Sequence, residues 1–113
     1  MLRIRPLELE LGPAPDDLTN FAREVEVVVE ADDDFRRYAA SFLVEVCSPS
    51  WLAERAASAG WTWGRRRLIL VTWDEALITG AITSLVHDTG ETEWLGLMRH
   101  LGQSLQAEEL PTG

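Results

Sequence analysis

The side chains best suited to hold a cation stand together at Asp32-Asp33-Asp34. Carboxylate oxygens are the ligands that calcium and magnesium prefer, but three consecutive side chains diverge, and the glycine of a helix–loop–helix calcium site is missing at its spacing. A solvated turn therefore explains the triplet better than a metal site. The basic run Arg65-Arg66-Arg67 could hold a phosphate or, in so acidic a chain, pair with nearby carboxylates. We expect no metal and no cofactor.

Nucleophilic or zinc-dependent chemistry would have to use Cys47, His87 or His100. Neither histidine is followed by another histidine or a cysteine two to four residues later, so the spacing of a structural zinc site is absent. Cys47 lies in an apolar segment without an activating neighbour, which predicts a small buried side chain in a protein from a reducing compartment. The sequence therefore predicts a protein that is not an enzyme.

Alternating apolar residues predict the strands that must position these groups. Residues 2–11 form a first strand whose apolar parity changes at Pro6, as at a bulge or a sheet edge, because proline cannot donate to a central ladder. In residues 22–30 one face carries Val25, Val27 and Val29 and the other carries Glu24, Glu26, Val28 and Glu30, so the first face is core and the second is in water. The aspartate triplet then leads to a strand over residues 38–47, which predicts an antiparallel hairpin with an acidic connection.

Helix signals follow the hairpin. Ser48 and Pro49 suit the N-cap and the first position of a helix that ends at Gly60. Asp74 is expected to cap a second helix and Thr92 a third. The second helix has its apolar stripe at Leu77, Ile78, Ala81, Ile82, Leu85 and Val86, and the third at Trp94, Met98, Leu101 and Leu105.

A strand between the first two helices completes the predicted fold. Residues 67–72 contain the unbroken apolar run Leu68-Ile69-Leu70-Val71, which indicates cover on both faces and a central place in the sheet. We predict an α+β fold in the order β-β-β-α-β-α-α, with an antiparallel sheet of about four strands packed against about three helices. It forms a single domain over residues 1–105, and residues 106–113 form a flexible tail.

The charge of the chain limits its partners. Nineteen acidic and ten basic residues, all of the latter arginine, give a net charge of −9, which repels phosphate backbones and argues against nucleic-acid binding. Glu8 and Glu10 interrupt the apolar N-terminal segment, and no stretch approaches the ~20 apolar residues of a membrane span. We therefore expect a cytoplasmic protein with a basic protein partner and no membrane contact. A homodimer stays open.

The five tryptophans serve either a core or an interface. Trp51 and Trp94 belong to apolar helix stripes, so we expect both in the core. Trp61 lies in a loop beside a glycine and is expected to be exposed. Trp73 stands between a strand and a helix, where either environment fits.

One segment is more specific than these patterns. The corner Val46-Cys47-Ser48-Pro49-Ser50-Trp51-Leu52, with Trp63-Gly64-Arg65 before an apolar strand, resembles the immunity protein 8 family of bacterial polymorphic toxin systems. Asp74, and then Thr92 with Trp94, follow in matching order, so that the resemblance covers about residues 22–105. Family members often close with a short aromatic and acidic segment, from which this chain departs after Leu105.

The resemblance implies a small α+β protein that binds a secreted toxin domain in the cytoplasm and neutralises it without catalysis. Many nuclease toxins are basic around their nucleic-acid groove, so an acidic inhibitor would be steered onto such a toxin. The alternative is an acidic interaction or regulatory module unrelated to toxins. The candidate partner-binding residues are Glu24, Glu26, Glu30, Asp32, Asp33, Asp34 and Trp61. The same side chains could instead serve only to keep the protein soluble.

Overall fold

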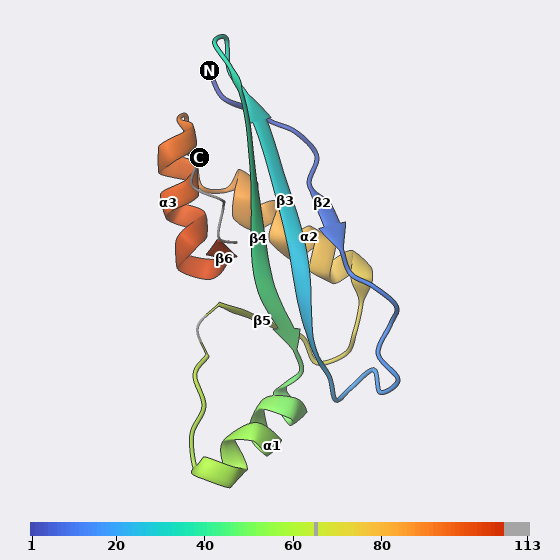
Figure 1. Cartoon of the computed structure of the whole chain (residues 1–113). Coiled ribbons are helices and arrows are strands. Elements are labelled where there is room, and N and C mark those ends of the chain that lie inside the picture. Colours follow the sequence, from blue (N-terminus) through green and yellow to red (C-terminus); the bar gives the residue numbers. More distant parts are fainter. Residues whose placement is uncertain (65, 108–113) are drawn as a thin grey trace.

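The computed structural model describes residues 1–64 and 66–107, and within that part it shows a six-stranded sheet and three helices (Figure 1). The elements are β1 (Arg3–Ile4), β2 (Glu8–Glu10), β3 (Ala22–Asp32), β4 (Arg37–Cys47), α1 (Pro49–Ala59), β5 (Arg67–Ile69), α2 (Glu75–His87), α3 (Trp94–Ser104) and β6 (Gln106–Ala107). The predicted α+β class is confirmed, with the first predicted strand divided into β1 and β2. The described fold extends two residues past Leu105 because β6 pairs with β4; residues 108–113 of the predicted tail lie outside the described residues.

The long antiparallel hairpin of β3 and β4 forms the centre of the sheet. β1 and β2 pair side by side along the same edge of β3. Ile4 lies opposite Ala31 and Leu9 opposite Val27, so the N-terminal segment has one residue more than β3 between these two pairs. The extra residue lies around Pro6, which confirms the predicted bulge and keeps Ile4 and Leu9 on the same face of the sheet.

That face is the core. Val25, Val27 and Val29 of β3 lie on this face as predicted, and their side chains are fully buried against α2 and α3, which cover the same side of the sheet (Figure 1). The buried cluster consists of Phe21, Val25, Val27, Val29, Phe42, Val44, Val46, Trp73, Ile78, Ile82, Val86, Leu97, Leu101 and Leu105. The opposite face carries the alternate residues of β3 and β4, and no helix of the described part covers it.

The predicted central place of the apolar strand is wrong. β5 has three residues and lies at the edge of the sheet, parallel to the end of β4. Leu68 and Leu70 pack on the core, whereas Ile69 and Val71 are 48% and 74% exposed. The continuous run therefore covers the core with one face only, because no strand follows β5 on its outer side in the described sheet.

The corner between β4 and α1 forms as the sequence predicts. The buried Ser48 hydroxyl accepts hydrogen bonds from the Trp51 N–H at 3.3 Å and from the Phe21 N–H at 3.1 Å, so it caps α1 and ties the corner to the start of β3. α1 ends at Gly60, whose φ of 82° is the left-handed conformation that glycine adopts without strain.

The two remaining helices differ from their predicted patterns in detail. α2 begins after Asp74, which accepts from the Leu77 N–H as predicted, but the Leu77 side chain is 58% exposed. Its buried stripe is narrower than predicted and consists of Ile78, Ile82 and Val86. The predicted cap of the third helix is wrong, because Glu93 rather than Thr92 occupies the N-cap position and makes no side-chain hydrogen bond.

The burial of the tryptophans also differs in part from the prediction. Trp94 is partly buried against the core, in line with the prediction. The prediction for Trp51 is wrong, since no residue of α1 is buried and the guanidinium groups of Arg55 and Arg67 instead pack on this ring. Trp73, which the sequence left undecided, is the indole that fills the core, packing edge-to-face on Phe21 with 5.4 Å between ring centroids.

Candidate functional site

The open face of the sheet gathers acidic side chains from neighbouring strands. The predicted contact residues Glu24, Glu26 and Glu30 lie on this face of β3, because Val25, Val27 and Val29, which alternate with this side of the strand, face the core. The pairing register adds glutamates that the sequence analysis did not single out. Glu10 of β2 lies opposite Glu26, and Glu45 of β4 lies opposite Glu24.

Two such pairs of like charge are unfavourable for folding, because directly opposed carboxylates repel each other across the strands. Arg67 of β5 relieves part of this repulsion through a 2.5 Å ion pair with Glu45. Among residues 1–64 and 66–107, no hydrogen bond or ion pair reaches the Glu24 side chain. Glu24 therefore keeps a negative charge that no described side chain pairs, and a basic surface would fit it.

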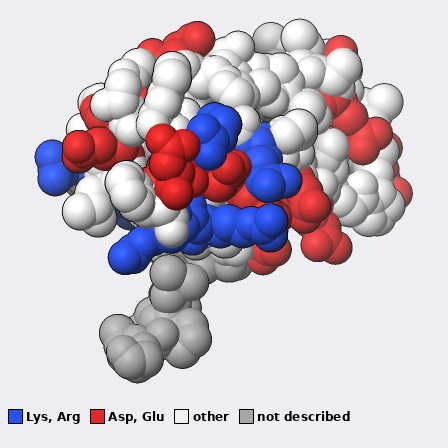
Figure 2. All heavy atoms as spheres, turned by 90° about the horizontal axis from the view of Figure 1, so that it is seen from above, with Lys and Arg blue, Asp and Glu red and all other residues white. Residues whose placement is uncertain are grey.

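The aspartate triplet behaves differently from that face. Asp32 pairs with Arg3 at 3.1 Å and with Arg5 at 3.6 Å, and Asp34 pairs with Arg3 at 3.3 Å. Figure 2 shows this end of the molecule from above, with arginine side chains lying between acidic ones. The predicted acidic patch at the triplet is thus largely neutralised within the protein.

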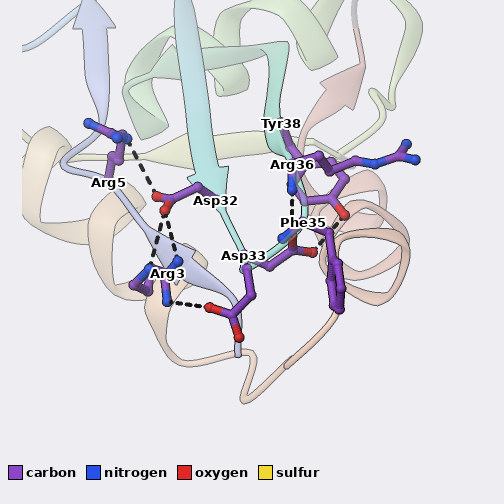
Figure 3. A network of polar contacts seen from close by, with 8 residues as sticks. Arg3, Arg5, Asp32, Asp33, Phe35, Arg36 and Tyr38 are labelled. Carbon is purple, nitrogen blue, oxygen red and sulfur yellow. Dashed lines mark hydrogen bonds and ion pairs between the residues drawn. The ribbon is translucent and has the colours of Figure 1, made fainter.

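Asp33 holds the hairpin turn together (Figure 3). Its Oδ1 accepts from the backbone N–H groups of Phe35 and Arg36, each at 2.8 Å, and its Oδ2 accepts from the Tyr38 hydroxyl at 2.7 Å. The Tyr38 bond and the two backbone bonds stabilise the carboxylate and lower its pKa from 3.8 to about 2. The same carboxylate raises the pKa of the Tyr38 hydroxyl that donates to it. The Asp33 carboxylate therefore stabilises the turn, and its charge already accepts three hydrogen bonds within the protein.

Trp61 is 60% exposed, in line with the prediction, but it does not stand alone. Trp63 is 69% exposed and packs edge-to-face on Trp61, with 5.7 Å between ring centroids. Trp63 also lines a pocket with Glu24 and Glu45, so an exposed aromatic pair borders the end of the acidic face. Trp63 was not predicted as exposed, although it stands beside Gly64 just as Trp61 stands beside Gly60.

The residues considered for chemistry are not assembled into a reactive site. Cys47 is fully buried, as predicted, and burial raises the pKa of its thiol, which disfavours the nucleophilic thiolate. His100 contacts Glu91 at 2.8 Å, a contact that the sequence did not predict. Arg66 donates to the Gly102 carbonyl and Arg67 pairs with Glu45, while Arg65 lies outside the described residues.

The described residues form neither a metal site nor a membrane-spanning helix. In residues 1–64 and 66–107 no three histidine, cysteine or acidic side chains come close enough together to hold a metal ion. None of the helices in the described part has both the length and the apolar character needed to cross a membrane.

Comparison with known proteins adds the family. No curated protein and no solved structure matches the chain. The family model of immunity protein 8 matches residues 9–108, which contain the whole hairpin, the Ser48 corner and all three helices. Such proteins belong to toxin systems and are typically inhibitors without catalytic activity, which favours the toxin interpretation over an unrelated regulatory module. The chain belongs to the immunity protein 8 family.

Proposed function

We propose that this chain binds its cognate toxin domain directly, one molecule to one, in the cytoplasm and blocks it by occlusion. The observation that carries the proposal is the acidic open face, on which Glu24 opposes Glu45 and Glu10 opposes Glu26. Directly opposed carboxylates repel each other even with Arg67 paired to Glu45, whereas a basic partner would add attractive contacts to them. The family supplies the partner, since an immunity protein neutralises a toxin.

The chemistry of the face indicates a basic toxin surface. A net charge of −9 attracts such a surface over a distance and raises the rate of productive encounters at low salt. A nuclease is one toxin of this kind, because its groove must hold a phosphate backbone. An acidic sheet laid over that groove would exclude the nucleic acid without any reaction.

The candidate residues then contribute to binding in different ways. Glu24, Glu26 and Glu30 contact the toxin together with Glu10 and Glu45. Asp32 and Asp34 border this surface and contribute less, because Arg3 already pairs with both. Asp33 shapes the turn beside it, and Trp61 with Trp63 forms an aromatic border at the opposite end.

Co-expression tests this proposal. The toxin domain encoded beside this chain is induced in a sensitive bacterium with and without the full chain, and the complex is sized by light scattering. We expect restored growth and a one-to-one complex. The double variant Glu24→Gln with Glu30→Gln should rescue less well than Glu75→Gln with Asp88→Asn, which removes two charges from α2 and its C-cap position. Rescue without a complex, or equal rescue by both variants, would contradict binding through the acidic face.

A further inference from the structure

The tip of the hairpin presents a phenyl ring to solvent. Phe35 is 94% exposed, although its backbone is among the best-fixed parts of the turn. Asp33 accepts from the Phe35 and Arg36 N–H groups, and its own N–H donates to the Arg36 carbonyl at 3.1 Å. Figure 3 shows the ring extending from this bonded turn. An aromatic side chain on a fixed backbone loses little conformational entropy when a partner covers it.

Further apolar side chains lie beside the tip. A groove between the hairpin and the start of α3 is lined in part by Met1, Phe35 and Leu95. Met1 is 88% exposed and Leu95 is 74% exposed. Tyr38 stacks on Trp94 in the same groove, with 5.1 Å between ring centroids, and so fixes the hairpin against α3. Exposed apolar groups that gather within a polar border mark interaction surfaces.

The charge at the tip differs from that of the acidic face. Four arginines surround three aspartates there: Arg3, Arg5, Arg36 and Arg37 with Asp32, Asp33 and Asp34. A balanced surface is less costly to desolvate than an acidic one, and a large ring can then be buried at its centre. A second copy of this chain is a poor occupant, because close approach would bring the neighbouring acidic faces together.

We infer that Phe35 anchors the toxin domain by entering an apolar pocket on its surface, beside the basic region that meets the acidic face. This inference rests on the proposed function. Glu24 and Asp32 are eight residues apart on β3, about 27 Å at the usual rise per residue. The groove beside Phe35 lies on the α3 side of the sheet and the glutamates lie on the other side, so one toxin domain reaches both by spanning the end of the hairpin. An interface of the usual ~800 Å² per partner is on the order of 30 Å across, which is long enough for this. The acidic face then governs association, and Phe35 governs dissociation.

Binding kinetics with the toxin domain encoded beside this chain test the anchor. Phe35→Ala should raise the dissociation rate constant about thirty-fold or more, the loss typical of a central aromatic anchor, and change the association rate constant by less than about two-fold. Leu77→Ala removes another exposed apolar side chain, from α2, and should leave both constants unchanged. Phe35→Trp should restore slow dissociation. Thermal unfolding of each variant should match the wild type, since the Phe35 ring is outside the core.

Asp33→Ala distinguishes the positioning of the Phe35 ring by the turn from the contact that the ring itself makes with the toxin. It keeps the ring but removes the carboxylate that fixes the turn, so dissociation should quicken, and the double variant Asp33→Ala with Phe35→Ala should dissociate no faster than Phe35→Ala alone. If the wild type binds and Phe35→Ala dissociates at the wild-type rate, the anchor is overturned while the proposed function stands. Failure of the wild type to bind overturns both. A dimer of the free chain that Phe35→Ala dissolves would assign the tip to a second copy instead.

Discussion

Glu24 and Glu45 lie directly opposite each other on β3 and β4, and Arg67 pairs with Glu45 alone. Among the residues that the structure describes, Glu24 thus faces a like charge without an ion pair of its own. This relationship distinguishes the open face from an ordinary soluble surface, on which opposite charges would alternate across the strands. It suggests that the glutamates are kept for a partner.

Glu24→Gln should therefore separate stability from binding. Removing one of two opposed charges should leave the free energy of unfolding unchanged or raise it by up to about 0.5 kcal/mol, while association with the toxin slows several-fold. Urea denaturation gives the first quantity and stopped-flow mixing the second. A clear loss of stability would show that Glu24 is a folding residue, in conflict with its proposed part in binding.

Ser48→Ala should destabilise the fold by about 2 kcal/mol. The buried hydroxyl accepts from both the Phe21 and the Trp51 N–H groups, so its removal leaves one helix donor and one buried donor just before β3 without their partner. Ser58→Ala is the matched control on the exposed surface of α1, where the change should stay within about 0.5 kcal/mol. Equal effects in chemical denaturation would show that Ser48 has no special role at the corner.

Trp73→Ala should lower the free energy of unfolding more than Trp51→Ala, because Trp73 is the more buried of the two side chains. Trp73 is 7% exposed within the core cluster, and its truncation should lower the free energy of unfolding by about 3–5 kcal/mol. Trp51 lies on α1 outside that cluster, so its truncation should cost only about 1 kcal/mol. Calorimetry of both variants decides the order, and a larger loss at Trp51 would restore the original sequence interpretation.

The Asp33–Tyr38 bond should be visible in two titrations. The folded pKa of Asp33 is lowered to about 2 from 3.8, so its stabilising effect is complete above about pH 4 and disappears as the pH falls through 2. The melting temperature of Asp33→Asn should accordingly lie below that of the wild type at pH 5, with the difference shrinking towards pH 2. A difference independent of pH would mean that the ionised carboxylate does not fix the turn.

Tyr38 reports the same bond at high pH. It is the single tyrosine of the chain, so the ultraviolet absorbance of tyrosinate follows this residue alone. Its pKa is raised above 10.0 because the hydroxyl donates to the Asp33 carboxylate. Asp33→Asn should bring the pKa back towards 10.0, and an unchanged titration would show that the two side chains do not share a proton.

The sequence predicts well what depends on neighbours along the chain. The bounds of α1 agree because a capping serine, a proline and a terminal glycine act locally, and the faces of β3 agree because alternation marks them. Strand partners are a different matter. Alternation shows that Glu24 faces water, but only the register reveals that Glu45 lies opposite it.

The wrong predictions share a physical cause, since burial depends on tertiary packing. The apolar run at β5 suggests cover on both faces, yet the strand lies at an edge; the apolar pattern around Trp51 suggests core, yet α1 stands beyond the end of β4 (Figure 1). Phe35 did carry a signal that the sequence analysis missed. A large apolar residue in the middle of a charged turn has no local reason to be there.

The salt dependence of association tests the central claim most directly. Association of the wild-type chain with the toxin domain is measured from low to high ionic strength and compared with Glu24→Gln plus Glu30→Gln. The association rate constant of the wild type should fall steeply with salt. The double variant should associate about ten-fold more slowly at low salt, and its association rate constant should depend less on salt. Equal rates and equal salt dependence for the two proteins would contradict toxin binding through the acidic face.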